Sequence, residues 1–391
     1  MSEWKECTIG DIGTVVGGAT PFTTDSRNYD NGNIPWITPK DLSDYHERYI
    51  SRGERNITEA GLKSCATQIL PKNTVLFSSR APIGYIAIAS NEVCTNQGFK
   101  SVIPNKDVDY LFLYYLLKYN KETIEGMGSG TTFKEVSKKT MEQIKVRVPK
   151  DISVQRRIAG ILDSLDSKIE LNNQINRNLE EQAQALFKNW FIDFEPFGGK
   201  MPDDWQTGKL SDIAEYEKDK IDVAKLNAET YYSTENMLPN KAGVSKAASL
   251  PTTEQTTRCI PGETIISNIR PYFKKIFYCT EEIAGCSADV LCFKPKKESF
   301  SIYNYDLLYS DNFFDYMVKG SKGTKMPRGD KSQIMNYDVV IPAESVISDF
   351  NNVVSNILQQ ISNNKKENEC LAKLRDTLLP DLMSGELCLN T

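Results

Sequence analysis

The sequence is poor in the residues that build metal sites and histidine-based catalytic sites. Among its 391 residues there is one histidine, His46, and none of the nine cysteines lies in a C-x-x-C pair. This spacing argues against a zinc site, and an odd cysteine count without disulfide spacing is typical of reduced thiols in a cytoplasmic protein. A single histidine also leaves almost no room for a catalytic triad or a histidine general base. We interpret the cysteines as small buried apolar residues.

Other signals of catalysis and of membranes are also missing. The N-terminal segment MSEWKEC carries charges where a signal peptide needs an apolar stretch, and no apolar run approaches the length of a membrane span. The sequence has no G-x-x-x-x-G-K-[ST] phosphate cradle and no D/N-P-P-Y/F tetrapeptide of amino-methyltransferases. We therefore expect a soluble, cytoplasmic binding protein that is not an enzyme and holds no cofactor or metal.

The overall charge gives no support to a nucleic-acid partner, because the formal net charge is −5 and the pI is about 5.4. Two loops are locally basic. In the segment around GSKGTKMPRGDKS only Asp330 opposes five cations, which are Lys319, Lys322, Lys325, Arg328 and Lys331. The loop GSGTTFKEVSKK carries Lys134, Lys138 and Lys139. Such loops suit phosphates and base edges, and a solvated charged loop is an equal alternative.

What the sequence does contain is the same domain twice. Three residues of ILPKNTVLFSSRAPIGYIAIA recur 190 positions later in CIPGETIISNIRPYFKKIFYC, where Pro71, Thr74 and Arg80 match Pro261, Thr264 and Arg270. Trp4 followed by TIGDI also corresponds to Trp205 followed by KLSDI. An offset of this length is too long for a solenoid repeat, so the duplicated unit is a whole domain.

Each copy is followed by a long segment with heptad spacing of apolar residues. In the first copy the two seam positions are Ile158, Leu165, Asn172, Leu179 and Leu186, then Leu162, Ile169, Asn176, Ala183 and Trp190. Adding 192 gives Phe350, Ile357, Asn364, Leu371 and Leu378, then Val354, Ile361, Asn368, Arg375 and Leu382. Polar seam residues are best known for fixing register and partner. An antiparallel pair would bring the four asparagines together at its centre, although two separate surface helices remain an alternative.

The globular parts read as mixed α+β domains. Short alternating apolar runs predict strands at 14–16, 34–38, 74–77, 83–89, 93–95 and 145–148, then at 264–267, 275–279 and 290–293, with helices at 111–119 and near 305–318. We predict recognition domains at 1–150 and 196–343, and long helices at 151–195 and 344–391. Forty helical residues span roughly 60 Å, so an antiparallel pair would separate two pseudo-twofold related domains by a fixed distance.

Several segments together resemble the specificity (S) subunit of type I restriction–modification systems. They are the opening WKECTIGDIGTVVGGATP, the stretches IPWITPKDL and VLFSSRAPIGYIAIASNEVCTNQGFKSV, the join LFKNWFIDFEPFGGKMPDDWQTGKLSDI and the ending LLPDLMSGEL. The resemblance covers the whole chain. It implies that two recognition domains each read one half of a split target in double-stranded DNA. It also implies that the paired helices dock two methyltransferase (M) subunits, to which restriction (R) subunits add. S-adenosylmethionine, ATP and Mg would then act on the partner subunits.

The matching segments and the basic loops supply the candidate DNA-binding residues. In the first domain these are Thr38, Lys40, Ser78, Ser79, Arg80, Asn96, Gln97, Lys100, Thr131, Thr132 and Lys134. In the second they are Asn268, Arg270, Lys274, Lys322, Lys325, Arg328 and Lys331.

Two questions about these residues stay open at the level of sequence. Arg80 and Arg270 either contact bases or stabilise a turn through a hydrogen bond to the backbone. Asn96 and Gln97 suit adenine edges, but their counterparts Ser287 and Ala288 lack the amides. The alternative function is a duplicated scaffold that bridges two protein partners without DNA.

Overall fold

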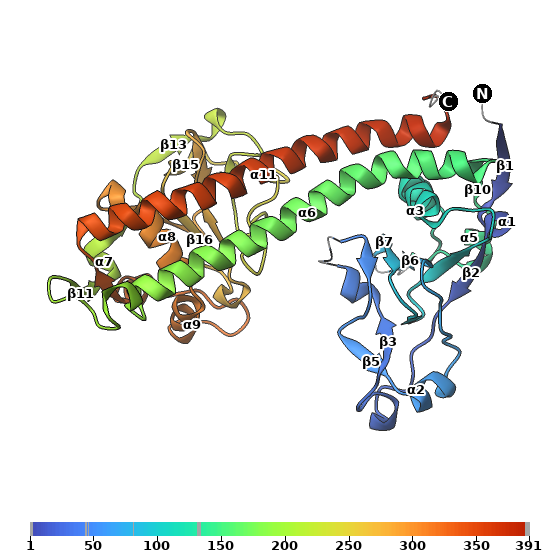
Figure 1. The fold of residues 1–391 in the computed structure, drawn as a ribbon, viewed down its shortest axis with the longest axis horizontal. Coiled ribbons are helices and arrows are strands. Elements are labelled where there is room, and N and C mark those ends of the chain that lie inside the picture. The colour runs from blue at the N-terminus through green and yellow to red at the C-terminus, as the bar shows by residue number, and fades with distance from the viewer. Residues whose placement is uncertain (1–2, 44, 46, 81, 131–133, 388–391) are drawn as a thin grey trace. The chain divides into compact units, whose positions relative to one another are not determined.

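The computed structural model describes residues 3–43, 45, 47–80, 82–130 and 134–387, and divides the chain into two compact units. Unit 1 contains Met1–Asn173 and Lys365–Thr391, and unit 2 contains Gln174–Asn364. Each unit therefore combines one globular recognition domain with parts of both long helices, α6 (Ile152–Phe191) and α11 (Glu344–Ser384) (Figure 1). The mixed α+β class, the repeated domain and the two long helices agree with the sequence prediction. The domain boundaries and the pseudo-twofold relation stay predictions.

The recognition domain of unit 1 is built on two sheets and a terminal strand pair. The larger sheet has the order β2-β9-β6-β7-β4 and the smaller β5-β3-β8, while β1 pairs antiparallel with β10 from Trp4↔Pro149 to Thr8↔Lys145. The strands are β1 (Trp4–Thr8), β2 (Gly13–Gly17), β3 (Ile34–Ile37), β4 (Tyr49–Ile50), β5 (Arg55–Ile57), β6 (Val75–Ser79), β7 (Ile83–Ala89), β8 (Cys94–Thr95), β9 (Lys100–Pro104) and β10 (Lys145–Pro149). The helices are α1 (Ile9–Ile12), η1 (Ser26–Asn28), η2 (Pro39–Leu42), α2 (Glu59–Ser64), α3 (Tyr110–Tyr119), α4 (Lys121–Gly126) and α5 (Lys138–Glu142).

Unit 2 repeats this plan with a larger second sheet. Its sheets have the orders β12-β19-β16-β17 and β13-β15-β18-β14, and β11 pairs antiparallel with β20. The strands are β11 (Gln206–Lys209), β12 (Ala214–Tyr216), β13 (Lys220–Asp222), β14 (Tyr231–Tyr232), β15 (Gln255–Cys259), β16 (Thr264–Ser267), β17 (Ile276–Tyr278), β18 (Ala284–Cys286), β19 (Val290–Pro295) and β20 (Asp338–Ile341). The helices are η3 (Glu195–Phe197), α7 (Leu210–Ile213), η4 (Val223–Lys225), η5 (Pro271–Phe273), η6 (Glu298–Phe300), α8 (Ser301–Tyr309), α9 (Asp311–Lys319) and α10 (Lys331–Met335).

The sequence prediction is wrong about one helix, which the structure divides into two. The sequence pattern predicts a single helix near 305–318, but α8 ends at Tyr309 and α9 begins at Asp311. Ser310 between them has an extended backbone with ψ 146°, and its side chain accepts a hydrogen bond from the Phe313 amide. A serine in this role caps the second helix, which favours a break over continuation.

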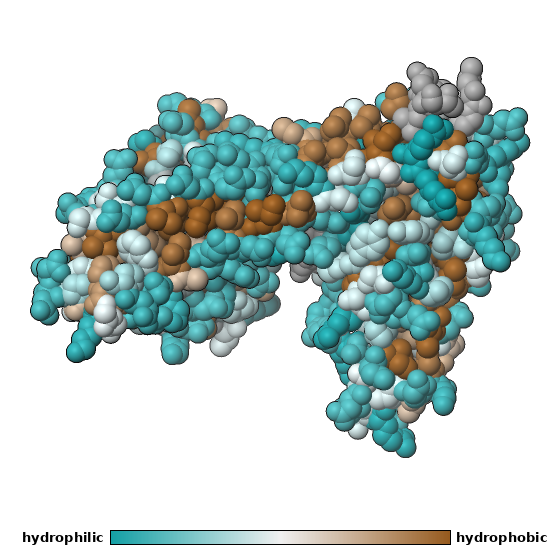
Figure 2. All heavy atoms as spheres, in the orientation of Figure 1, coloured by the Kyte–Doolittle hydropathy of each residue, from teal (hydrophilic) through white to brown (hydrophobic). Residues whose placement is uncertain are grey.

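In each unit a hydrophobic core joins the recognition domain to both long helices. In unit 1, α3 packs between the main sheet and the helices, and its buried Phe112 shares a core with Leu162 of α6 and Leu382 of α11 (Figure 1). In unit 2, Tyr303 of α8 shares a core with Phe187 of α6 and Phe350 of α11. Figure 2 shows further apolar side chains along the long helices. Each recognition domain is therefore held by two helix segments that are far apart in the sequence.

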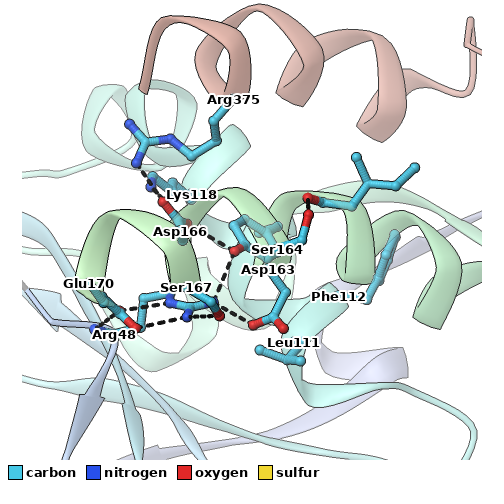
Figure 3. Close-up of polar contacts among 12 residues, drawn as sticks. Arg48, Leu111, Phe112, Lys118, Asp163, Ser164, Asp166, Ser167, Glu170 and Arg375 are labelled. Carbon is cyan, nitrogen blue, oxygen red and sulfur yellow. Dashed lines mark hydrogen bonds and ion pairs between the residues drawn. The ribbon is translucent and has the colours of Figure 1, made fainter. Parts of the chain in front are cut away.

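A buried ion network adds to the core of unit 1 (Figure 3). Arg48, which is 5% exposed, bonds through its guanidinium to Asp163, Ser167 and Glu170 of α6. Its backbone amide also donates to Glu170, at 3.0 Å. The network continues through Tyr115, Asp166 and Arg375 of α11, where the Arg375 guanidinium lies 2.6 Å from the Asp166 carboxylate.

The network explains an unusual seam residue. Arg375 stands at a heptad position that is apolar in the sequence pattern except at Asn368. Its charge is matched by Asp166, which is itself 5% exposed. An arginine is tolerated at such a position because the pair satisfies both buried charges. The network as a whole ties the segment before β4 to α6, and α6 to α11.

The seam asparagines form two antiparallel couples, one within each unit. In unit 1 the Asn172 amide donates to Asn368 at 2.9 Å and to Glu367 at 2.7 Å. In unit 2 the Asn364 amide donates to Asn176 at 2.7 Å. Since Asn172 corresponds to Asn364 and Asn176 to Asn368 in the repeat, the two couples join corresponding positions. The predicted antiparallel pairing of the seams is thus present in each unit.

Candidate nucleic-acid interface

In unit 1 the predicted DNA-binding segments lie next to one another. The Ser79 amide donates to the Gly98 carbonyl at 2.7 Å, and the Asn96 amide donates to the Ile37 carbonyl at 3.0 Å. The Val136 amide donates to the Ser79 carbonyl at 3.0 Å, which brings in the basic loop. Four segments that the sequence separates widely are therefore held side by side by backbone hydrogen bonds.

Some of the predicted residues in this cluster hold the backbone rather than face solvent. Ser78 Oγ donates to the Pro82 carbonyl at 2.8 Å and accepts from the Tyr85 amide at 2.7 Å. Ser79 Oγ donates to the Gly98 carbonyl at 3.2 Å, and both serines are fully buried. Thr38 directly precedes η2, and its amide and hydroxyl both donate hydrogen bonds to the Asp41 carboxylate. These three side chains shape the site from within.

The side chains that reach solvent form a cationic and amide-bearing surface. Lys40, Gln97 and Lys134 are exposed, and Arg80, Asn96 and Lys100 are partly exposed. Asn96 Oδ1 accepts a hydrogen bond from the Gly98 amide at 2.8 Å, and the Gln97 side-chain oxygen accepts one from the Thr20 hydroxyl. Thr131 and Thr132 lie outside the described residues. We name the exposed and partly exposed residues of this cluster surface 1.

One carboxylate lies at the centre of surface 1. Glu135 is 3.1 Å from the Lys100 ammonium and 3.7 Å from the Arg80 guanidinium. The Arg80 guanidinium is thus paired with a carboxylate. This pair tests neither of the two roles considered for Arg80, which are base contact and a turn-stabilising hydrogen bond to the backbone. Lys40 is paired in the same way, with Glu54 at 2.7 Å. The Lys40–Glu54 pair is largely exposed, so it contributes little stability and a phosphate can compete for this lysine.

In unit 2 the basic loop folds onto the turn after β16. The Lys322 and Arg328 backbones exchange hydrogen bonds of 2.9 Å in both directions, so the loop closes as a small hairpin. The Arg270 amide donates to the Pro327 carbonyl at 2.7 Å, and the Gly329 amide donates to the Asn268 carbonyl at 3.2 Å. The loop is therefore a folded element with a defined neighbour.

The cations of this loop are all exposed, and two of them have acidic partners. Lys322 lies 2.6 Å from Asp330, and hydrogen bonding to Lys322 holds the pKa of that carboxyl below its usual range. Arg328 lies 3.0 Å from Asp289, an acid that the loop sequence does not reveal. The Lys331 ammonium sits 5.7 Å from the centre of the Tyr216 ring. We use the name surface 2 for Asn268, Arg270, Lys322, Lys325, Arg328 and Lys331.

Asn268 and Arg270 carry unused hydrogen-bonding groups in surface 2. Asn268 is 8% exposed. Its Oδ1 and the buried Nε of Arg270 both have no hydrogen-bond partner among the described residues. Arg270 Nη2 lies 3.5 Å from the Lys325 carbonyl, the outer limit of a hydrogen bond. Lys274 is placed differently, because its ammonium lies 2.9 Å from Asp311, which also binds Lys241 at 2.7 Å.

The described part of the chain offers neither a metal-binding cluster nor a membrane-spanning helix. It contains no group of three or more histidine, cysteine, aspartate or glutamate side chains arranged to hold a metal ion. Within the same residues, none of the helices is both long and apolar enough for a membrane span.

The chain is similar to restriction–modification proteins over nearly its whole length. Residues 1–181 and 202–374 match the type I restriction modification DNA specificity domain. The chain is 34% identical to the type I restriction enzyme MjaIX specificity subunit of Methanocaldococcus jannaschii, over 98% of this chain and 94% of that protein. It is 22% identical to the type I restriction enzyme HindI specificity subunit of Haemophilus influenzae, over 99% of this chain and 100% of that protein.

A solved structure agrees at the level of fold. The crystal structure of the type I restriction–modification system S subunit from M. genitalium aligns with 100% of this chain and 97% of its own chain, at a TM-score of 0.61 and 16% identity. The repeated domain, the paired long helices and the sequence matches lead to one conclusion. The chain belongs to the family of type I restriction–modification specificity subunits.

Proposed function

We propose that this chain is the DNA-reading subunit of a type I restriction–modification complex. Each recognition domain reads one half of a bipartite target in double-stranded DNA, unit 1 through surface 1 and unit 2 through surface 2. Two M subunits methylate adenine in the target and R subunits cleave unmodified DNA. The chain itself is not catalytic, and S-adenosylmethionine, ATP and Mg²⁺ act on the partners.

One observation carries the proposal. In each unit, residues from segments far apart in the sequence converge into a single cationic surface with amide groups, although the whole chain has a net charge of −5. Cations attract phosphates and amides read base edges. A scaffold that bridges two protein partners would not require this local reversal of charge in both copies.

The long helices supply the docking sites for M subunits and the spacing between the two half-targets. Exposed apolar side chains on them, Leu171 and Leu374 in unit 1 and Val353 in unit 2, suit a protein partner. The asparagine couples fix the register of the helix pair, because a shifted register would bury unpaired amides.

Domain exchange tests whether each recognition domain reads its own half-target. The chain is produced together with its M subunit, and adenine methylation is mapped across the host genome. We expect a bipartite site, and we expect replacement of residues 1–150 by the same domain of a relative to change one half only. A change in both halves would contradict independent reading. An unchanged site would contradict reading by this domain.

Neutralisation of surface 2 tests the electrostatic part of the proposal. Changing Lys322, Lys325, Arg328 and Lys331 to glutamine should weaken DNA binding by the complex and reduce the log–log salt slope by about one unit per lost phosphate contact. The matched control changes four exposed lysines on other segments of unit 2, Lys200, Lys225, Lys246 and Lys297. Equal slopes for the two variants would identify the loop as a solvated surface, and the absence of any salt dependence in the native complex would favour the scaffold.

An insertion tests the spacing role of the helices. Four residues added after Asn176 lengthen α6 by about 6 Å and rotate the remainder of the helix by roughly 40°. We expect methylation of a site with a longer spacer, or loss of methylation, with both half-sequences preserved in any site that is still modified. Methylation of the original site at the original spacing would show that the helices do not set the distance.

A further inference from the structure

Surface 2 adjoins a pair of exposed aromatic rings. Tyr272 is 49% exposed and Phe273 is 37% exposed, and their ring centres lie 4.8 Å apart. Both belong to η5, the turn that links β16 to β17. Exposing two neighbouring aromatic rings on a protein surface gives up the free energy of their burial, so such a pair marks an interaction site.

The backbone holds this turn in a defined and strained shape. Arg270 before it and Lys274 after it both have φ of 50°, in the left-handed region that side chains with a Cβ disfavour. The turn is closed by hydrogen bonds of 2.9 Å from the Phe273 amide to the Arg270 carbonyl and from the Lys274 amide to the Pro271 carbonyl. The rings are therefore presented by a rigid element.

Neighbouring segments fix the turn from two sides. The Asn240 amide donates to the Phe273 carbonyl at 2.7 Å, and the Lys241 amide donates to the Lys274 carbonyl at 2.9 Å. On the other side, the Arg270 amide is bound to the basic loop at Pro327. Strain at both ends of a well-anchored turn indicates that the position of the rings is under functional constraint.

The surroundings of the rings are cationic. The Lys275 ammonium lies 5.9 Å from the centre of the Phe273 ring, and Arg270 directly precedes the turn. Exposed Lys325 and Met326 lie in the adjacent loop, whose Pro327 binds Arg270. Aromatic rings framed by lysine and arginine complement a polyanion with flat apolar rings, which is what nucleic acid offers.

The aromatic pair has no counterpart at the corresponding positions of the first copy. The corresponding turn of the first copy has Pro82 and Ile83 at the two ring positions, and Ile83 is buried in the core. The repeat therefore keeps the arginine before this turn, as Arg80 and Arg270, while the aromatic pair stands only in the second copy.

We propose that Tyr272 and Phe273 form an aromatic wedge that stacks against base pairs of the half-target read by unit 2 and unstacks one base step. This inference rests on the DNA-reading function proposed above. Inserting such a wedge costs a DNA deformation energy that depends on the base step. This energy is lowest at flexible pyrimidine–purine steps. The second half-target is thus selected partly by its deformability.

The test uses the complex of the full chain with its M subunit and a duplex that contains the target found by methylation mapping. Adenines in and beside the second half, on either strand and except the adenine to be methylated, are replaced one at a time by 2-aminopurine, which still pairs with thymine and whose fluorescence rises when it loses its stacking partners. We expect one position to brighten on binding. The change of Tyr272 and Phe273 together to alanine should abolish that signal and weaken binding roughly tenfold or more, since the stacking of two rings on the bases is lost.

Three controls distinguish an aromatic wedge from a general apolar or electrostatic contact with DNA. Phe273→Tyr with Tyr272→Phe keeps both rings and should keep the fluorescence signal. Ile283→Ala removes an apolar side chain that is 52% exposed between β17 and β18 and should change nothing. The salt slope should be the same in the double alanine variant as in the native complex, because no charge is removed.

The outcomes distinguish this inference from the function on which it rests. If the native complex binds the target with the expected salt slope but no position brightens, the wedge is wrong and DNA reading stands. If the double alanine variant binds DNA normally but no longer assembles with the M subunit, the rings are a protein contact and the wedge is wrong. If the native complex binds no DNA, the proposed function fails first.

Discussion

The two units attach the same recognition fold to the same pair of helices by different chemistry. In unit 1 the attachment contains ion pairs, with Arg48 and Arg375 matched by carboxylates on α6. In unit 2 the attachment instead contains a cluster of aromatic rings, in which the ring centre of Phe350 lies 4.9 Å from that of Phe191 and 6.2 Å from that of Phe187. A shared fold therefore constrains the shape of this interface more than the type of interaction that fills it.

The difference extends to buried carboxyl groups. In unit 2, burial raises the pKa of Asp306 to about 7 and that of Glu263 to about 7. Asp306 is 1% exposed, and its Oδ1 accepts a hydrogen bond from the Gln184 side-chain amide at 3.2 Å. Its Oδ2 has no hydrogen-bond partner among the described residues. In unit 1 the buried carboxylate Asp166 is matched by Arg375 and Tyr115 instead. The ion network thus balances its buried charge, while the aromatic interface contains a carboxyl that is better accommodated when protonated.

The largest effect is expected from removing an aromatic ring at the attachment of unit 2. Phe350→Ala should destabilise that unit by roughly 4 kcal/mol, because a fully buried ring in contact with three others is lost and leaves a cavity. Hydrogen exchange measured peptide by peptide should show faster exchange in unit 2 and little change in unit 1. The nearby Val353→Ala, at a position 46% exposed, serves as the control. A uniform loss across both units would contradict separate attachment.

Removal of the central cation of unit 1 should come next. Arg48→Ala should cost roughly 3 kcal/mol in unit 1, since Asp163 and Glu170 lose a buried partner but remain partly hydrated. Arg48→Lys should recover only part of this loss because lysine cannot form the bidentate contact. The exposed Arg52→Ala is the matched control. A denaturant titration monitored by hydrogen exchange measures the free energy of unfolding of unit 1. A cost below about 1 kcal/mol for Arg48→Ala, which is the range of a surface ion pair, would show that the network does not anchor the domain.

A third prediction concerns pH and unit 2. The carboxyl of Asp306 has a pKa of about 7 when folded against 3.8 for the ordinary group, so the folded state binds the proton more tightly. Below about pH 4 both states are protonated and there is no penalty. As pH rises from there to about 7, the unfolded state releases its proton first and the stability of unit 2 falls.

Asp306→Asn should remove much of that penalty. The full penalty on the ionised form is roughly 4 kcal/mol, and we expect a gain of roughly 2 kcal/mol at about pH 8 because the amide keeps only some of the hydrogen bonds. Glu263 retains part of the pH dependence, which Asp306→Asn combined with Glu263→Gln should flatten further. Unfolding midpoints measured between about pH 4 and pH 8 decide the matter, and an unchanged slope in the single variant would assign the pH dependence elsewhere.

The smallest effect is expected at the seam asparagines. Changing Asn172, Asn176, Asn364 and Asn368 to leucine should stabilise the helix pair by about 1 kcal/mol per couple while weakening the choice of register. The unit 1 couple should gain more, because Asn172 Oδ1 is buried without a described partner, whereas Asn364 Oδ1 also accepts from Gln360 at 2.8 Å. Denaturation of the two couple variants, made separately, measures the difference. Equal gains would mean that the unpaired oxygen costs nothing.

Local patterns in the sequence predicted a large part of the architecture. The 190-residue offset revealed the repeat, and the heptad spacing of residues such as Leu162 and Val354 predicted two long helices with antiparallel seams. These features were predictable because helical periodicity and turn residues act over a few positions and are repeated along the chain. Strands at 83–89 and 264–267 followed from alternation of the same local kind.

The features that the sequence could not reveal depend on contacts between distant segments. The Arg48 network, the partner of Arg328 at Asp289, and the burial of Ser78 and Ser79 all arise where strands and loops meet in space. The exposure of Tyr272 and Phe273 is of the same kind, because aromatic residues in a short apolar run look like core residues until the turn places them outside. Sequence alone determined which elements form and that they form twice. Tertiary structure decided which side chains of each copy became anchors and which became surface, because burial and charge pairing depend on neighbours that lie far away along the chain.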